Sequence, residues 1–436
     1  MGVKAVKFGG TSLASASQIA KAVAIIRADP DRRYMVASAP GKRSSSDTKI
    51  TDLLYQLYEQ RDGDYRPTLT RIRQRFTEIA DELGVAVDLD FEFSVIERHL
   101  SSADGTDYFA SRGEYLNSLL ISAHLGFTFI DAADVVRFSD SGEFLAEETN
   151  TLLGEALSKV DTAVVPGFYG ATSAGTVKTF SRGGSDVTGA LVARAVHADV
   201  YENWTDVSGI LMADPRIVAS PAPIERISYT ALRQLTYLGA SVLHENAIHP
   251  VRTQRIPINI RNTDRPEDEG TWIQADVPPS ADVPSSPGSS MMVGLAGRTG
   301  CVAITVRKVQ WSGSLGVGAA LLRLFDEAQI AVDLVLTSVD AWTMVIRGNS
   351  STVESLVDAM ETLNPDSINI RDGLALVGVV NSGTVPIGTL AARMTDALTR
   401  AEIEIYLDSC AGDMHVVAID ESFYEDTLRT LYGALA

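Results

Sequence analysis

The chain is poor in cysteine: Cys301 and Cys410 are the only two among its 436 residues. Two cysteines cannot build a disulfide framework or a four-cysteine zinc site. No apolar run reaches the roughly 18 residues that a membrane helix needs. The start, Met1 to Lys4, leads into a strand-like segment instead of the apolar core of a signal peptide. These absences predict a soluble, cytoplasmic protein of enzyme size.

Basic residues are also scarce relative to acidic ones. Lys and Arg together number 37 against 56 Asp and Glu, which gives a formal net charge of −19. Such an acidic chain is a poor candidate for nucleic-acid binding through its overall charge. The hydrophobic share of 45% is ordinary for a packed protein. At roughly 150 residues per domain, the length predicts about three domains.

A stretch rich in proline and serine, residues 277–290, reads as a surface linker. Before it, strand-like and helix-like segments alternate, which predicts an α/β domain with a largely parallel sheet and helices on both faces. The expected strands are 3–8, 34–39, 127–131, 163–167, 199–204 and 256–262, the last one before the linker. The expected helices are 18–27, 50–60, 67–83, 112–125 and 186–197.

After the linker, the sequence contains an internal repeat. Leu315-Gly316 and Ile387-Gly388 lie 72 residues apart, and each opens an amphipathic helix. The helices lead into strands at 330–336 and 403–407, and further strands are expected at 342–346 and 414–419. A strand–helix–strand–strand unit repeated at this interval is typical of ferredoxin-like halves.

Two glycine turns follow strands and open helices: Lys7 to Ser12 and Ser181 to Asp186. Paired glycines let a backbone approach a ligand closely, and exposed N–H groups at a helix start suit phosphate. Arg182 could grip a carboxylate bidentately. Alone, the Lys7 turn is better explained as a plain tight turn, and Asp186 could simply be a favourable first-turn charge. Together they favour a phosphate site.

Other motifs carry weaker signals. Arg112-Gly113-Glu114 is expected to open a helix, where Glu114 could be no more than a charge near the helix N-terminus. His244 and His249 are five residues apart, so they would not share a helix face as zinc ligands do. No local Ser-His-Asp or Cys-His pattern is present, although a spatial one is possible. We therefore expect no metal ligands from the protein.

Taken together, the motifs resemble those of the aspartate kinases of the amino-acid kinase family. The resemblance rests on their order: Lys-Phe-Gly-Gly-Thr-Ser at 7–12, Ser-Ala-Pro-Gly-Lys at 38–42, Thr-Asp-Leu-Leu at 51–54, Arg-Gly-Glu-Tyr at 112–115, Arg-Gly-Gly-Ser-Asp at 182–186 and Trp-Thr-Asp-Val at 204–207, continuing at 239–244 and 258–262. It implies an amino-acid-kinase α/β/α sandwich at 1–276, the linker, and two ferredoxin-like (βαββαβ) ACT domains. The first ACT domain, 299–371, would be inserted into the second, 291–298 plus 372–436.

The resemblance implies transfer of a phosphoryl group from ATP to the side-chain carboxylate of L-aspartate, giving 4-phospho-L-aspartate for lysine, threonine and methionine synthesis. A carboxylate is already an anionic nucleophile, so positioning and charge stabilisation are the main tasks. Mg²⁺ would be held mostly through the ATP phosphates. The implied catalytic residues are Lys7 and Asp186; the substrate residues are Ser38, Thr51, Glu114 and Arg182; the nucleotide residues are Lys7, Gly9, Gly10, Thr205, Asp206 and Arg216.

The resemblance also implies a homodimer formed through the ACT domains and an effector pocket near Ser314, Val332 and Asp333. Lysine is expected ahead of threonine as the effector, while Asp333 could equally be an exposed strand residue. Ser241 and Leu211 depart from residues found in many relatives at the nucleotide site. Two other functions stay open: a kinase of the same fold for another small carboxylate, and a non-catalytic amino-acid sensor.

Overall fold

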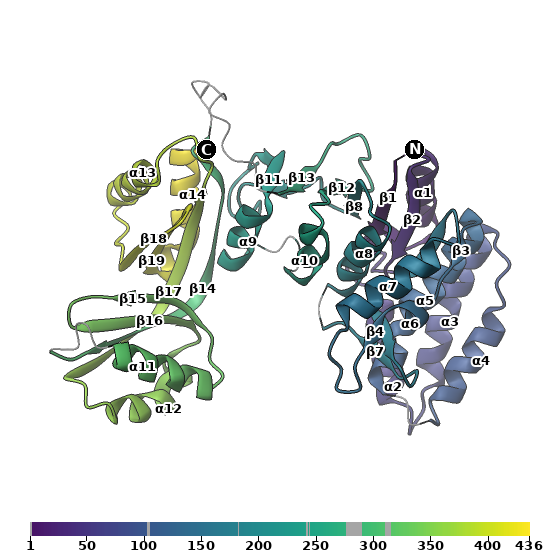
Figure 1. The fold of residues 1–436 in the computed structure, drawn as a ribbon, viewed down its shortest axis with the longest axis horizontal. Coiled ribbons are helices and arrows are strands. Elements are labelled where there is room, and N and C mark those ends of the chain that lie inside the picture. The colour runs from purple at the N-terminus through teal and green to yellow at the C-terminus, as the bar shows by residue number, and fades with distance from the viewer. Residues whose placement is uncertain are drawn as a thin grey trace. The chain divides into compact units, whose positions relative to one another are not determined.

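Figure 1 shows a computed structural model of the chain, which describes residues 2–102, 105–181, 183–240, 243, 245–275, 290–309 and 315–436. The chain divides into two compact units. The first comprises Met1–Ile210, Pro223–Thr230 and Ser241–Val277, and the second comprises Leu211–Ala222, Ala231–Ala240 and Pro278–Ala436. The second unit thus takes in two segments that the sequence analysis assigned to the kinase domain. Apart from Ser290, the expected linker lies outside the described residues.

The first unit is built on an eight-stranded sheet with the order β11-β13-β12-β8-β1-β2-β5-β3. All neighbouring strands run parallel except β12 and β13, as the α/β alternation predicted. The strands are β1 (Lys4–Phe8), β2 (Arg32–Ala37), β3 (Thr128–Phe129), β5 (Ala163–Pro166), β8 (Val200–Thr205), β11 (Arg226–Ser228), β12 (Ile258–Asn262) and β13 (Thr271–Gln274).

Two expectations about these elements were wrong. Strand β12 is not the last before the linker, because β13 follows it and pairs with it in the antiparallel sense. Only four residues long and preceded by a polar loop, β13 shows too short an alternation to be read from the sequence. The helix expected to open at Arg112 begins six residues earlier, at Thr106, so Arg112 and Glu114 lie in its interior.

The helices of the first unit and its 3-10 turn surround this sheet. They are η1 (Thr11–Leu13), α1 (Ala16–Arg27), α2 (Ile50–Glu59), α3 (Arg66–Leu83), α4 (Leu89–His99), α5 (Thr106–Leu125), α6 (Ala132–Val135), α7 (Ala146–Leu157), α8 (Gly184–Ala195) and α10 (Glu245–Thr253), while α9 (Tyr229–Leu238) crosses into the second unit. Within the described ranges, none of the helices is long and apolar enough to cross a membrane.

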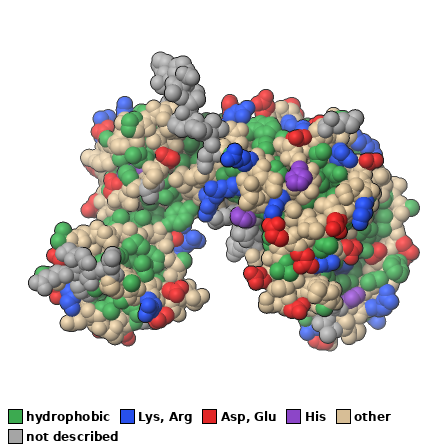
Figure 2. Space-filling view, in the orientation of Figure 1, with side chains coloured by type: hydrophobic (Ala, Val, Ile, Leu, Met, Phe, Trp, Pro, Cys, Tyr) green, Lys and Arg blue, Asp and Glu red, His purple; other side chains and the backbone are tan. Residues whose placement is uncertain are grey.

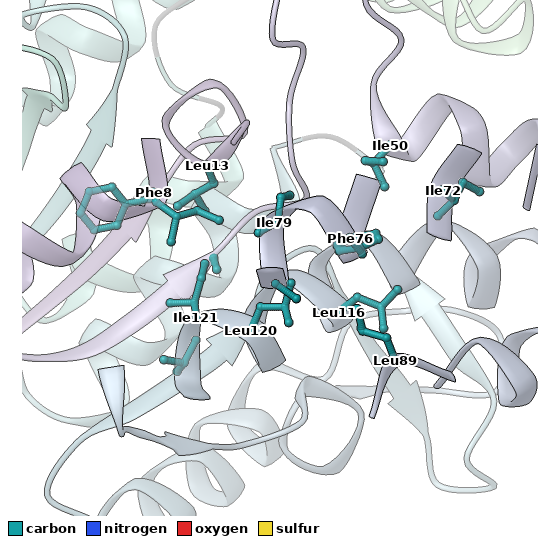
Figure 3. Close-up of a cluster of buried hydrophobic side chains, with 14 of the residues drawn as sticks. Phe8, Leu13, Ile50, Ile72, Phe76, Ile79, Leu89, Leu116, Leu120 and Ile121 are labelled. Atoms are coloured by element: carbon teal, nitrogen blue, oxygen red, sulfur yellow. The ribbon is translucent and has the colours of Figure 1, made fainter. Parts of the chain in front are cut away.

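One large core lies between the sheet and helices α1 to α5 (Figure 3). Phe8 of β1 and Trp204 of β8 are fully buried in it. Since side chains alternate along a strand, Lys7 faces the opposite side of the sheet, where α8 packs. Burial of each such large side chain stabilises the fold by roughly 1.5–3 kcal/mol. The core therefore fixes β1 and β8 and leaves their polar residues on the α8 side.

Five further short strands lie in the first unit, except that β9 ends with a residue of the second unit. β4 (Arg137–Phe138), β6 (Tyr169–Thr172) and β7 (Val177–Thr179) form a small sheet, and β9 (Ile210–Leu211) pairs with β10 (Pro223–Ile224). The turn before β6 contains Phe168 at a φ of 79°, a left-handed conformation that bulky residues rarely adopt. Gly184, at the start of α8, packs against it: an added Cβ there would lie 2.7 Å from the Phe168 ring.

The second unit contains a six-stranded sheet with the order β15-β16-β14-β17-β19-β18. Its strands are β14 (Met292–Arg307), β15 (Val332–Thr337), β16 (Ala341–Arg347), β17 (Ser367–Asn381), β18 (Leu407–Ala411) and β19 (Met414–Asp420). Its helices are α11 (Leu315–Glu327), α12 (Ser350–Glu361), α13 (Ile387–Arg400), η2 (Glu421–Phe423) and α14 (Tyr424–Leu435). The strand expected at 403–407 was misplaced, since β18 begins only at Leu407.

Two long central strands join the halves of this sheet. The segment 301–307 of β14 pairs with 367–374 of β17, whereas 292–298 pairs with 376–381. Each half then has the strand order of a ferredoxin-like βαββαβ fold. Helices α11 and α12 belong to the first half, and α13 and α14 belong to the second. The second half takes its last strand, 292–298, from before the first half. Segment 292–298 thus pairs with a strand of the carboxy-terminal half, as an inserted first ACT unit requires, while the domain bounds stay a prediction.

Acidic and basic side chains are interspersed over the face of the molecule shown in Figure 2. The excess of acidic residues in the composition is therefore spread among neutral and basic groups on that face. This distribution is typical of a protein surface exposed to water.

Candidate functional site

The ammonium group of Lys7 is held by two polar side chains on the α8 side of the sheet. Its Nζ lies 2.7 Å from Asp186 Oδ1 and 3.3 Å from Asn203 Oδ1. The amide nitrogen of Asn203 also donates to Asp186 Oδ1, at 2.9 Å. Lys7 is 7% exposed. The structure thus brings together the two residues expected to be catalytic, near the carboxyl end of β1 and the first turn of α8.

In the glycine turn after β1, the two backbone amides expected to contact phosphate differ in their hydrogen bonding. The N–H of Gly9 donates to the carbonyl of Trp204 at 2.9 Å, so it extends the sheet and is not free for a phosphate. The expected phosphate contact of the Gly9 amide is therefore wrong for this conformation. The N–H of Gly10 has no acceptor within the described part of the chain. Gly10 remains the candidate for an amide contact.

The first glycine turn packs closely against the loop after β2, and the second turn contains a glycine in a left-handed conformation. The N–H of Gly41 donates to the Gly10 carbonyl at 2.8 Å, and a Cβ on Gly41 would come within 2.6 Å of Gly10. The loops after β1 and β2 are therefore in direct contact. In the second turn, Gly183 has a φ of 58° and precedes α8. Arg182, which precedes it, lies outside the described residues.

Glu114 is a buried carboxylate with an unused oxygen. It is 6% exposed, and within the described residues its Oε2 has no hydrogen-bond partner. Burial raises the pKa of Glu114 to about 8, although backbone hydrogen bonding near Ala39 and the charge of Arg112 oppose the rise. Such a group gains most from a cationic ligand, because an ammonium would replace the lost hydration.

Gly113 lets Glu114 approach the loop after β2. An added Cβ on Gly113 would lie 2.7 Å from the Ala39 side chain and 3.3 Å from Ile50. Ser38 and Thr51 are the chain neighbours of these two contact residues, and both are half-buried. The structure therefore gathers three of the expected substrate residues, Ser38, Thr51 and Glu114, around the start of α2 and the middle of α5.

The expected nucleotide residues do not all fall in one unit. Thr205 ends β8, and its hydroxyl contacts the Asp206 carboxylate at 3.2 Å. Arg216 belongs to the second unit, where it is exposed and pairs with Asp214 at 2.5 Å. Leu211 also lies in the second unit, and Ser241 lies outside the described residues.

A cavity of about 480 Å³ lies on the α1 side of the sheet. Trp204 and Arg32 line it, and they alternate in β8 and β2 with residues on the Lys7 side. The cavity is therefore separate from the Lys7–Asp186 pair.

Asp333 is held within the second unit. Its side chain is 7% exposed and lies 2.9 Å from Arg298 Nη2 and 3.6 Å from Arg347 Nε. The reading of Asp333 as a merely exposed strand residue is therefore wrong. Val332 packs against the core of its ACT unit, while Ser314 lies outside the described residues.

Two site residues were missed by the sequence reasoning. Asn203 holds both Lys7 and Asp186, and Asn117 of α5 donates to the carbonyl of Ser38 at 2.8 Å. Both asparagines are buried. An amide in the apolar strand Val200–Thr205 was a readable signal for Asn203, because buried polar groups need partners. Asn117 gave no such signal, since its helix contains many small polar residues.

Comparisons with known proteins agree with this architecture. The Amino acid kinase family model matches residues 2–262. Aspartokinase 3 of Bacillus subtilis is 32% identical over 424 residues, covering 92% of this chain and 91% of the relative. Lysine-sensitive aspartokinase 3 of Escherichia coli is 26% identical over 417 residues, covering 86% of each chain.

Solved structures give the same result. The crystal structure of Clostridium acetobutylicum aspartate kinase superimposes with a TM-score of 0.88 at 36% identity, over 100% of both chains. E. coli aspartokinase III in complex with aspartate and ADP matches in fold, with a TM-score of 0.76 at 24% identity over 99% of both chains. The chain, with its Lys7–Asp186 pair at the end of a parallel sheet and its fused ACT-type sheet, belongs to the amino acid kinase family and, within it, to the aspartokinases.

Proposed function

We propose that the protein transfers the γ-phosphoryl group of ATP to the side-chain carboxylate of L-aspartate. The observation that carries the substrate assignment is Glu114, a buried carboxylate whose second oxygen lacks a partner in the described structure. A substrate ammonium would fill that place. Arg182, assigned from the sequence alone, would bind the α-carboxylate. Ser38 and Thr51 would line the same pocket.

Lys7 would stabilise the charge that develops on the transferred phosphoryl group. Asp186 and Asn203 hold its ammonium in place before substrate arrives, so little reorganisation is needed during the reaction. The substrate carboxylate attacks as an anion, so no general base is required. Catalysis then rests on alignment and on charge neutralisation.

The nucleotide would contact the Gly10 amide, Thr205 and Asp206, all of the first unit. Arg216, which the resemblance also assigns to the nucleotide, stays a prediction from the sequence alone. Mg²⁺ fits a place among the ATP phosphates, because Asp186 already gives one oxygen to Lys7 and magnesium usually keeps few protein ligands. The metal would neutralise phosphate charge. We retain the division into a catalytic region 1–276, a linker 277–290 and ACT domains 299–371 and 291–298 plus 372–436. A homodimer through the ACT sheets remains part of the proposal.

A coupled assay of ADP release over a panel of acids tests the substrate assignment. L-Aspartate should be phosphorylated, whereas N-acetyl-L-aspartate and succinate, which lack the ammonium, should not. Glu114→Gln should raise the KM for aspartate at least about tenfold, in line with the loss of a buried charge-assisted contact. Glu59→Gln, an exposed change on α2, should leave it unaltered.

The same panel separates the other two functions. If another carboxylate is phosphorylated in preference to aspartate, the protein is a kinase of the same fold with a different substrate. Binding of an amino acid without turnover of any acid would identify a sensor.

A further inference from the structure

A thiol, an imidazole and a carboxylate form a chain on the β18–β19 hairpin, at the edge of the second sheet. Cys410 and His415 are opposite each other in the strand register. Cys410 Sγ lies 2.7 Å from His415 Nδ1, and His415 Nε2 lies 3.1 Å from Asp408 Oδ1. His415 is 1% exposed, whereas Cys410 is exposed. The sulfur is thus the end of the chain that a reagent can reach.

The surroundings of His415 define its protonation state. Burial lowers the pKa of His415 and the Asp408 carboxylate opposes this, so the imidazole is neutral at pH 7. No other charged group in the described structure contributes to this shift; the facing residue on β17 is the apolar Val379. Partial burial and the charge of Asp408 raise the pKa of the Cys410 thiol. The resting pair is therefore a neutral thiol beside a neutral imidazole.

The geometry fixes the direction in which a proton can move. A proton on Nε2 faces Asp408, which leaves the Nδ1 lone pair directed at the thiol. The contact to Asp408 falls short of hydrogen-bond alignment, and Nε2 is buried without another partner in the described residues. Because the Asp408 side chain is 48% exposed, a small rotation would complete the bond. A nucleophile, its base and an orienting acid are then in line.

We propose that Cys410 is a modification site: its thiol, activated by His415 as general base, reacts with peroxides and alkylating electrophiles. With hydrogen peroxide, sulfur attacks one oxygen, the O–O bond breaks, and the other oxygen leaves as hydroxide. His415 takes the thiol proton and passes it to the hydroxide, giving water. The thiol is oxidised to a sulfenic acid and the peroxide is reduced, so that RSH and H₂O₂ give RSOH and H₂O.

Cys301 provides an internal comparison. It is the only other cysteine of the chain, it is buried, and burial raises the pKa of its thiol. Among the described residues, no imidazole contacts its sulfur, and the residue is buried. Both thiols experience the same reaction conditions. A difference between their rates therefore reports the environment of each thiol and not the conditions.

The test measures alkylation by iodoacetamide and sulfenic acid formation by hydrogen peroxide, residue by residue, by mass spectrometry of the full-length protein. Cys410 should react faster than N-acetylcysteine at pH 7, and Cys301 should not react in the folded protein. Because transfer to a neutral imidazole needs no prior ionisation, the Cys410 rate should stay nearly constant from about pH 7 to 8, which lies between the lowered pKa of His415 and the raised pKa of Cys410.

Substitutions test the two partners. His415→Gln should lower the Cys410 rate at pH 7 at least about tenfold, the low end of general-base effects. Asp408→Asn should lower it by a smaller factor. Asp413→Asn removes an equal charge from the same hairpin and should have no effect. Thermal scans of each variant show whether it is folded.

Three results would overturn the proposal. One is a Cys410 rate no higher than that of N-acetylcysteine. Another is a rate that rises tenfold per pH unit in both wild type and Asp408→Asn. The third is protection of Cys410 that a chelator relieves, since the three groups would then be ligands of a bound metal ion.

Discussion

At the scale of the residue, neighbouring side chains hold the Lys7 ammonium in position for the phosphate contact proposed above. The pair is largely buried and shares Asn203 as a third member. In the proposed reaction, an incoming phosphoryl group would compete with Asp186 for the Lys7 ammonium. Within the described structure, Asp186 has no cationic partner other than Lys7.

The first prediction removes that cation. Lys7→Ala should lower kcat roughly a hundred- to a thousand-fold, the usual effect of losing a group that stabilises transition-state charge. The KM for aspartate should change little. Lys4→Ala is the matched control, because Lys4 lies on the same strand and pairs with Asp29 instead. Steady-state kinetics of both variants give the comparison, and near-native kcat in Lys7→Ala would remove Lys7 from catalysis.

The second prediction concerns Glu114 and pH. Burial raises the pKa of this carboxyl from 4.5 to about 8, so between these values the folded state binds a proton that the unfolded chain has released. Stability conferred by this group therefore falls as pH rises from 4.5 to 8. Glu114→Gln removes the effect. Its stability advantage over wild type should grow by on the order of 4 kcal/mol across this window.

Thermal unfolding without substrate, at pH 5 and pH 8, measures this difference. The gap in Tm between Glu114→Gln and wild type should widen at pH 8, while Glu59→Gln should follow wild type at both. A constant gap would mean that Glu114 is ionised in the folded protein. A widening gap would show that this group, which is proposed to bind substrate, lowers the stability of the free protein.

At the scale of the element, α3 anchors the loop between β2 and α2. Arg75, 5% exposed, donates to the carbonyls of Ala14 and Gly41 and pairs with Asp47 at 2.7 Å. Arg43 and Arg75 hold the pKa of Asp47 well below its usual range. Helix α3 therefore holds the loop after β1 and the loop after β2, which border the proposed substrate pocket.

The third prediction follows from this anchor. Arg75→Met keeps much of the side-chain volume but leaves Asp47 without its buried partner. The variant should lose about 3–5 kcal/mol of stability, as expected for a broken buried pair, and its KM for aspartate should rise. Arg73→Met on the same helix breaks the exposed pair with Asp90, worth about 0–1 kcal/mol, and a cation–π contact with Phe93, worth about 0.5–1 kcal/mol. Urea unfolding and kinetics distinguish the two, and equal stabilities would refute the anchoring role.

At the scale of the whole molecule, the second unit is a single sheet made of two interlocked halves. Strands β14 and β17 each serve both halves, so a change in one half can reach the other through continuous backbone. Asp333 pairs with Arg298. Arg298 lies near the point where β14 passes from one half of the sheet to the other. An effector ammonium that pairs with Asp333 must displace Arg298.

The fourth prediction tests regulation. Lysine should inhibit the kinase more strongly than threonine, and Asp333→Asn should abolish the lysine response by removing the charge that an ammonium would bind. Asp358→Asn, an exposed change on α12 of the same half, should respond as wild type does. Inhibition curves with both amino acids provide the measurement. Equal sensitivity in Asp333→Asn and wild type would exclude Asp333 from the effector site.

Local patterns in the sequence were sufficient to predict the parallel sheet, the glycine turns and the repeat of about 70 residues. The resemblance carried by motif order added the kinase fold and the roles proposed for Lys7 and Asp186, whose side chains the structure brings into contact. These features are visible because alternation, helical periodicity and turn residues act over a few neighbours. Even the inserted ACT arrangement left a trace, an extra apolar strand before the repeat.

The tertiary structure decided what depends on contacts between distant segments. Gly113 and Glu114 looked like a helix start, but they lie inside α5, where close packing on Ala39 buries the carboxylate. The Gly9 amide looked free, but a strand nearly 200 residues away supplies its acceptor. Asn203, and the meeting of Cys410 with His415, likewise depend on strand pairing. Burial and pairing are set by the whole chain, and they determine the charge state and availability of each group.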